Sequence, residues 1–453
     1  MEETVTDNAA VTLVGFGALI VLLFFLIAWY KWHVFAALLI PILLFAALPT
    51  VDRVTFIDAF ETGFGSTIES IAVVIVLGSI IAEALRHTGG IERITSSMIK
   101  MVGRRRMPLA LTLSGFVIGI AIFSDVGYVI LNPLVHSAAL ETGATMSTMA
   151  TGLVGAMQLT HAMVPPTPGP LSAIALVGAD VGKVILFGTL ITLIGALAGW
   201  LFARLVGHRV PSPPSEEFTG QAVSEQDRKL PPLGLAYAPI LVPLVLIAGQ
   251  SVADLTLREG SIPHDILSFI GWPVFALSVG VALSYLLSHR MTGKQDKENR
   301  RDKWIENALR GSAMIIVVTG LGGALSEILQ ATPAVDTIAN WVAGTGLPTI
   351  FLPFVLGVVG NMITGSTTVG VITAASIAAP MMEQLSLSPE ATMLAGAAGS
   401  VIVKYVNSSY FWVCTSLSRM PLRSALISYG GVTLVNGVVS MLAVFGLWAA
   451  GAL

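Results

Sequence analysis

Long uncharged apolar runs are the feature that most limits what this chain can fold into. One of them, VTLVGFGALIVLLFFLIAWY, covers residues 11–30 without a single charge. A run of this length can cross about 30 Å of hydrocarbon as a helix. Similar runs recur towards the C-terminus, and only 11% of the 453 residues are charged, against about 25% in a soluble domain. The chain is therefore predicted to be an all-α, multi-pass membrane protein.

The composition also narrows the function classes. The one cysteine, Cys414, excludes an internal disulfide framework, and no cluster of metal-binding side chains or nucleophile–base pair is visible. We therefore expect no metal, no cofactor and no enzymatic activity. A net charge of −3 gives no reason to expect a nucleic-acid partner. The acidic start MEETVTDNAA differs from the basic start of a cleavable signal peptide.

The distribution of charge predicts the topology. Basic residues concentrate in segments 86–106 and 290–303, with six in each, and the positive-inside rule places both in the cytoplasm. Segments 49–61 and 251–265 are net acidic and are predicted to be external. The proline-containing segment 209–232 is predicted to be a cytoplasmic linker between two halves. Both termini are then external.

The two halves resemble each other in sequence. With an offset of 244 residues, segment 77–94 aligns with 321–338, so that Gly78 meets Gly322 and Glu83 meets Glu327. Each half contains five predicted spans, an odd number, so the halves must have opposite orientations. We therefore predict two inverted repeats, 1–208 and 233–453. The predicted spans are 11–30, 33–49, 68–86, 147–178 and 182–206, and then 234–250, 269–288, 310–329, 390–415 and 424–449.

Two further apolar segments each consist of two arms, and each arm is too short to span the membrane. Segments 107–141 and 347–383 each have two arms of about 15 residues, and such an arm reaches only about 22 Å. We predict two re-entrant helical hairpins, one from each side of the membrane. The alternative, one long kinked span each, would make the halves parallel. The weakly amphipathic segments 90–101 and 334–346 precede the hairpins and suit interfacial arms that connect a fixed part to a moving part.

Helix breakers interrupt spans 147–178 and 390–415. The first break, VPPTPGP, removes amide donors and ends the helix, leaving free carbonyls and the N-terminus of a half-helix. Such backbone is tolerated in a bilayer only where protein or a water-filled cavity satisfies it, and a half-helix N-terminus favours a carboxylate. The two breaks and the two hairpin tips, FSDVG and TGSTT, are expected to converge near the midplane. Inverted repeats with broken helices are typical of secondary transporters.

Three ionisable residues stand out in these segments. Asp125 lies at a hairpin tip among apolar residues, where acids are costly and usually functional, although a helix cap is the alternative. His161 precedes the first break and titrates near neutrality, with a histidine bonded to backbone as the alternative. Both are proton-coupling candidates. Lys404 is the only cation deep in a predicted span. It is predicted to pair with a substrate carboxylate, or with Asp125 or Glu83 internally.

The full set of predicted substrate-binding residues comes from the two tips and the two breaks. It comprises Ser124, Asp125, Gly127, His161, Pro166, Thr167, Gly365, Ser366, Thr367, Thr368, Asn407, Ser408 and Ser409.

Four motifs resemble those of the gluconate permease (GntP) family within the ion transporter superfamily, in the same order and over nearly the whole chain. They are FSDVGYVILNPL, HAMVPPTPGPL, GSTTVGVITAA and VNSSYFW. The resemblance implies a bacterial inner-membrane proton symporter for gluconate, a related sugar acid, glycerate or D-serine, built as an elevator-like homodimer. The chain departs from the family pattern in two places. Thr167 stands where a second histidine is usual, and Asn407 to Tyr410 replace NDSG.

The sequence therefore predicts a secondary active transporter that carries a small organic acid anion with a proton. Sodium coupling is the closest alternative, because Ser, Thr, Asn and backbone carbonyls also form sodium sites. A substrate of the D-serine or glycerate type is another alternative. A channel would need a continuous polar lining, which these spans lack. The expected partners are the substrate, protons or sodium, membrane lipid and a second copy of the chain.

Overall fold

The structure is a computed structural model that describes most of the chain. The described residues are 9–30, 32–48, 51–216, 230–258, 260–291, 297–332, 344, 346–402, 404–405 and 408–453. Within them the regular secondary structure is helical, with no strand. The helices of the first half are α1 (Ala9–Ala28), α2 (Val34–Ala46), α3 (Arg53–Thr88), α4 (Gly90–Val102), the 3-10 turn η1 (Arg104–Arg106), α5 (Met107–Gly119), α6 (Ser124–Thr142), α7 (Met146–Met163), α8 (Pro168–Val177) and α9 (Val181–Val206).

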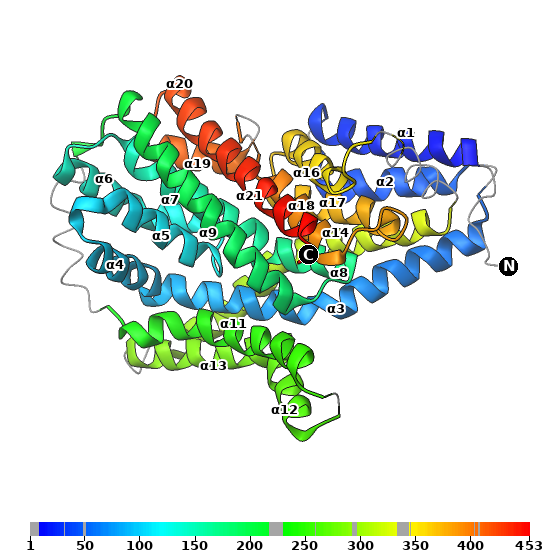
Figure 1. The fold of residues 1–453 in the computed structure, drawn as a ribbon, viewed down its shortest axis with the longest axis horizontal. Helices are drawn as coiled ribbons and strands as arrows, with labels where there is room; N and C mark the ends of the chain where they lie inside the picture. The colour runs from blue at the N-terminus through cyan, green and yellow to red at the C-terminus, as the bar shows by residue number, and fades with distance from the viewer. Residues whose placement is uncertain are drawn as a thin grey trace.

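The second half follows a similar order of elements (Figure 1). Its helices are α11 (Leu233–Thr256), α12 (Ile262–Gly271), α13 (Pro273–Met291), α14 (Lys297–Gln330), α16 (Phe351–Thr364), α17 (Thr367–Ala378), α18 (Pro389–Ser400), α19 (Ser409–Leu417), α20 (Leu422–Ala425), a π-helical turn (Leu426–Gly430) and α21 (Gly431–Ala449). The predicted arm 334–346 lies almost entirely outside the described residues.

Several helices are suited to cross a membrane. In the described part of the chain, five are long and apolar enough, or six if the bent pair α12 and α13 forms one span. The predicted spans 147–178 and 390–415 are each divided between two shorter helices, α7 with α8 and α18 with α19. The ten-span topology and the inversion of the halves stay predictions, because length and composition do not fix orientation.

The long helices α3 and α14 extend beyond the predicted spans 68–86 and 310–329. Asp52 begins α3 by accepting a hydrogen bond from the Thr55 backbone amide at 2.9 Å, and Gly89, at a φ of 77°, ends it. The acidic stretch 49–61, predicted to be an external segment between spans, is thus mostly helical in its described part. Hydropathy marks only the apolar part of a helix and does not detect its polar extension.

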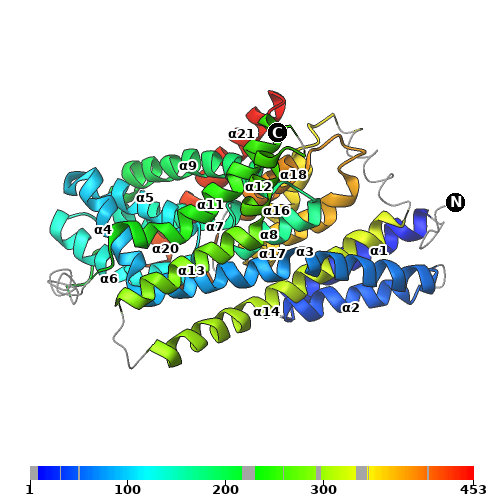
Figure 2. The same ribbon diagram turned by 90° about the horizontal axis from the view of Figure 1, so that it is seen from below.

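The helices α3 and α14 pack closely along each other (Figure 2). Their contact depends on small residues, because a Cβ on Gly63 would lie against the Gly323 backbone and only 2.7 Å from the Glu327 Cβ. Gly65, one half-turn away, faces open space. The absence of a side chain at Gly63 therefore sets the distance between the two longest helices.

We expect Gly63→Ala to lower the stability of the purified protein by about 1–3 kcal/mol, the usual effect of forcing an extra methyl group into a packed contact. Gly65→Ala is the matched control. It places the same methyl group in open space and is expected to leave stability unchanged or slightly increased, since alanine favours helix. Thermal melting in detergent measures both variants. Equal melting temperatures for the two would contradict the packing argument.

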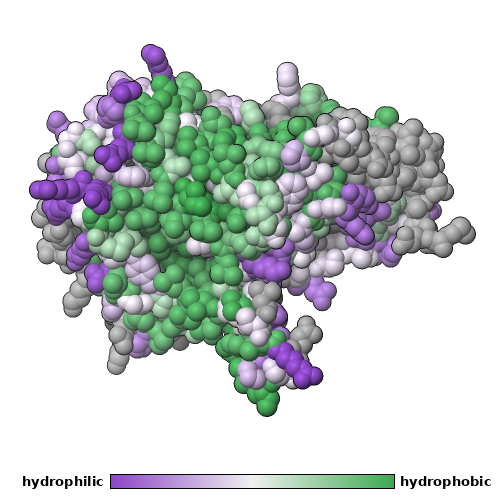
Figure 3. Space-filling model, in the orientation of Figure 1, coloured by the Kyte–Doolittle hydropathy of each residue, from purple (hydrophilic) through white to green (hydrophobic). Residues whose placement is uncertain are grey.

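The helix breaks and hairpin turns lie at the centre of the packing. α5 packs against α7, α16 against α18, and α17 against both α8 and α18. The closing helices α9 and α21 pack against each other. A broad apolar face covers the middle of the molecule, with hydrophilic residues towards its ends (Figure 3). On α9 this surface includes Leu186, Leu190, Ile194, Leu197 and Leu201, each 40–49% exposed. Their spacing of three and four residues forms one stripe, as expected of a lipid-facing helix.

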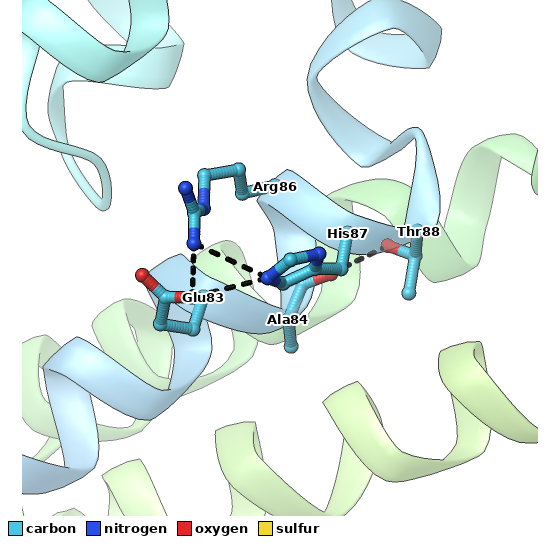
Figure 4. A network of polar contacts seen from close by, with 5 residues as sticks. All are labelled: Glu83, Ala84, Arg86, His87 and Thr88. Atoms are coloured by element: carbon cyan, nitrogen blue, oxygen red, sulfur yellow. Dashed lines mark hydrogen bonds and ion pairs between the residues drawn. The ribbon is translucent and has the colours of Figure 1, made fainter. Parts of the chain in front are cut away.

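Glu83 belongs to a local polar cluster at the end of α3 (Figure 4). Its carboxylate accepts a hydrogen bond from Arg86 at 2.7 Å and lies 3.2 Å from His87 Nε2. The His87 ring stacks on Trp304 of α14, with ring centroids 5.8 Å apart. These contacts give Glu83 a structural role and occupy it with partners other than Lys404.

Candidate functional site

A cavity of about 150 Å³ lies where the predicted tips and breaks meet. Its walls come from the turn before α6, from α7, from the turn between α16 and α17, and from the segment between α18 and α19. The lining residues are Phe123, Ser124, Asp125, Gln158, His161, Gly365, Ser366, Thr367, Thr368, Lys404, Ser408 and Tyr410. Residues of both halves thus form one polar cavity.

Three helices begin at this cavity. Ser124 and Asp125 form the first turn of α6, Thr367 and Thr368 that of α17, and Ser408 is the N-cap of α19. The unpaired backbone amides and the positive end of the helix dipole favour negative charge at each of these positions. These three helix starts therefore favour an anion, whereas the Asp125 carboxylate in the same lining favours a cation.

Lys404 adds a formal positive charge to the cavity. Its side chain is only 2% exposed, and Nζ donates to Asn361 Oδ1 and, at 3.0 Å, to the Gly365 carbonyl. Asn361 is itself oriented by donating to the Ile402 carbonyl at 2.8 Å. The internal ion pairs predicted as one alternative are not formed among the described residues, because the two partners of Nζ are neutral. Among the described residues the third N–H of the ammonium has no acceptor.

Three buried polar atoms in the cavity wall have no hydrogen-bond partner among the described residues. They are Ser124 Oγ, His161 Nδ1 and Ser408 Oγ, in side chains 6%, 7% and 1% exposed. A buried polar group left unpaired costs about 1–3 kcal/mol. Three such atoms around one cavity indicate that the cavity binds a polar ligand, or binds water that a polar ligand displaces.

The Nδ1 atom of His161 makes no hydrogen bond to backbone among the described residues. Its imidazole instead lies beside Phe123, with ring centroids 5.2 Å apart at an angle of 50°, and Nδ1 is unpaired among the described residues. The ring is therefore held by packing while one nitrogen stays free to donate to or accept from a ligand.

Asp125 lies at the cavity but is exposed, whereas the sequence suggested a desolvated carboxyl. The reason is that the hairpin tip opens into the cavity. Nor is Asp125 the N-cap of α6, a position that Phe123 occupies. Its Oδ1 accepts only from the adjacent Val126 amide, at 2.9 Å. The carboxyl is thus accessible to protons and to a ligand.

Sequence reasoning missed Gln158. Its Nε2 donates to Thr367 Oγ1 at 3.3 Å, and its Oε1 accepts from the Tyr429 hydroxyl at 3.0 Å. Tyr429 lies in the π-helical turn before α21, so Gln158 connects that turn to the tip between α16 and α17. The available signal was its position three residues before His161, which places both side chains on one face of α7.

Other predicted residues lie outside the cavity lining. Pro166 and Thr167 line a separate small cavity that His161 also borders. The Thr167 hydroxyl lies within donating distance of the carbonyls of His161 and Val164, at 2.8 and 3.0 Å, and so offers its one O–H to backbone groups freed by the break. Gly127 packs against Met157, where a side chain would clash. Asn407 lies outside the described residues, as does the side chain of Ser409.

Gly78 explains how α3 reaches this region. A Cβ at this position would lie 2.8 Å from the carbonyl oxygen of Pro166. Only glycine therefore allows α3 to pack directly against the break between α7 and α8. In the described part of the chain no group of three or more His, Cys, Asp or Glu residues is arranged to hold a metal ion.

The chain is similar in sequence to known permeases and transporters. The model of the GntP family permeases matches residues 10–451. An uncharacterized permease of Haemophilus influenzae is 32% identical over 421 residues, covering 89% of this chain and 85% of that protein. A gluconate permease of Pseudomonas aeruginosa is 29% identical over 437 residues, covering 96% and 95%. The D-serine transporter DsdX of Escherichia coli is 29% identical over 433 residues, covering 94% and 96%.

Among solved structures, the YdaH transporter of Alcanivorax borkumensis has a similar fold. Its TM-score is 0.62 at 15% sequence identity, and the match covers 88% of both chains. At this identity the similarity concerns the fold alone.

Proposed function

The chain belongs to the GntP permease family, and from this premise we propose that it is a secondary active transporter that symports a small sugar-acid or hydroxy-acid anion with a proton. The family and the relatives are permeases, so the chain is a membrane transporter and not an enzyme. We place it in the inner membrane of a bacterium. The observation that carries the proposal is the cavity that combines Lys404 with three unpaired buried polar atoms.

In this proposal the substrate carboxylate binds at the free N–H of Lys404 and the N-terminal turn of α17. A charge-assisted hydrogen bond of this kind is stronger than a neutral one. The substrate hydroxyls pair with Ser124 Oγ, His161 Nδ1 and Ser408 Oγ. A polyhydroxy acid would satisfy all three buried atoms at once, which a simple inorganic anion does less well.

A zwitterionic substrate is the second candidate, because Asp125 and Lys404 line the same cavity. An amino acid could place its carboxylate at Lys404 and its ammonium group at Asp125. The D-serine transporter relative makes this substrate class a necessary part of the test.

Counterflow in proteoliposomes tests the function directly. Proteoliposomes that contain the purified protein are loaded with gluconate, glycerate, D-serine or a simple monocarboxylate, at fixed sodium and varied pH. We expect exchange with a hydroxylated acid, and accumulation driven by an inward proton gradient without sodium. Uptake that requires sodium and ignores the proton gradient would overturn proton coupling. Failure of every hydroxylated acid would overturn the assigned substrate class.

For the architecture, we propose two inverted repeats, 1–208 and 233–453, in an elevator-type homodimer. The similar order of elements in the two halves supports the repeat, and α4 suits the arm that connects α3 to α5. The elevator motion and the dimer are proposed by analogy with the family.

Single cysteines at positions 220 and 261 report the topology. Cys414 is buried, 2% exposed, and contributes little background labelling. We expect an impermeant thiol reagent added outside intact cells to label position 261 and to leave position 220 unlabelled. Labelling of both positions from the same side would contradict the inverted arrangement.

A further inference from the structure

A second, larger cavity of about 320 Å³ lies between α4 and α6 and shares no lining residue with the substrate cavity. Its walls are apolar where the two helices face each other, at Ile99 on α4 and at Ile130 and Leu134 on α6. Lys100 and Arg104 also line it, as do Glu92 and Glu141. The cavity therefore combines an apolar interior with charged side chains of both signs.

The charged residues that line this cavity are two bases and two acids, but the chain at the end of α4 is basic. Segment 100–106 carries four basic residues and no acid, and Arg104, Arg105 and Arg106 are exposed. Arg104 also pairs with Glu141 at the end of α6, an ion pair that joins the two sides of the cavity. The same segment belongs to the basic loop that the positive-inside rule places at the cytoplasmic face.

We propose that this cavity binds an anionic glycerophospholipid from the membrane. Its phosphate contacts Lys100 and the arginines of η1, and one acyl chain lies between α4 and α6 on Ile99, Ile130 and Leu134. Clustered basic residues at the cytoplasmic surface attract anionic lipids, while the apolar interior suits a hydrocarbon chain, which a free phosphate lacks. The bound lipid connects α4 to the helix that carries Asp125. Its binding does not depend on the proposed transport function.

Native mass spectrometry of the purified protein tests the site. With equal amounts of phosphatidylglycerol and phosphatidylcholine, we expect at least a fivefold preference for phosphatidylglycerol. Lys100→Gln should reduce that preference about fivefold, the usual effect of one basic residue near an anionic surface. Lys303→Gln is the matched control, because Lys303 is exposed near the start of α14, within the other basic segment, and does not line the cavity. Glycerol phosphate, which lacks acyl chains, should not displace the lipid.

Ser137→Trp tests the apolar interior separately, since Ser137 lines the cavity and an indole would fill it. We expect loss of bound lipid with an unchanged melting temperature. If this variant unfolds, Lys100→Gln still tests the proposal, because the Lys100 side chain is exposed and its removal leaves the packing intact. Equal binding of the two lipids, or an equal loss in Lys100→Gln and Lys303→Gln, would overturn the proposal. Displacement by glycerol phosphate would assign the site to a free anion instead.

Discussion

Replacing Lys404 with glutamine is expected to weaken substrate binding by about 10- to 100-fold and to reduce uptake to background. The ammonium is buried and held by Asn361 and Gly365, so its remaining N–H is available to a substrate carboxylate. A hydrogen bond to a charged group contributes about 1.5–3 kcal/mol, and each 1.4 kcal/mol is a factor of ten in affinity. Glutamine retains a donor for one of the two neighbours but removes the charge. Isothermal titration of the purified variant measures the loss.

The control for Lys404 separates binding from folding. Lys183→Gln removes an ammonium that lies outside the cavity, 3.9 Å from Glu390, and is expected to bind substrate normally. Melting temperatures of both variants are measured alongside. If Lys404→Gln melts at a lower temperature but binds substrate with unchanged affinity, then Lys404 only anchors the turn between α16 and α17, and the substrate carboxylate binds elsewhere.

The residues around Lys404 illustrate what the sequence could predict. The helix breaks and turns were predictable, because proline, glycine and short polar motifs interrupt a helix wherever they fall within apolar sequence, and a bilayer tolerates such breaks only at protected positions. Ser124, His161, Gly365, Ser366 and Ser408 were accordingly predicted to share a site, and all of them line the cavity.

The partners of these residues were not predictable in the same way. Asn361 is 43 residues from Lys404 in sequence, and no local pattern relates the two. Gln158 is a lone amide within a buried helix, and its role appears only when Thr367 and Tyr429 are placed beside it. The exposure of Asp125 depends on how the tip meets the cavity. Sequence patterns locate breaks in local structure, whereas long-range packing decides what each side chain contacts.

The clearest test of coupling is Asp125→Asn, which is expected to retain substrate exchange and to lose accumulation driven by a proton gradient. Asp125 and Lys404 line one cavity, so an ionised Asp125 offsets the charge that attracts the substrate. At 4 Å, two like charges repel by about 1 kcal/mol in water and about 4 kcal/mol at an effective dielectric constant of 20. Because Asp125 is exposed in this structure, the lower value applies until the cavity closes around the substrate.

Protonation of Asp125 removes this repulsion, so the proton and the anion favour each other's binding by the same factor, as symport requires. Asparagine has the shape of the protonated acid, and therefore binds the anion at any pH without carrying a proton across. Counterflow should persist in Asp125→Asn, while uptake driven by an inward proton gradient should fall to the level of passive exchange. Asp58→Asn, which removes an exposed carboxylate on α3 that does not line the cavity, is the matched control. If Asp125→Asn accumulates substrate with an unchanged pH profile, the coupling role passes to His161, and His161→Gln should then show the uncoupled behaviour in its place.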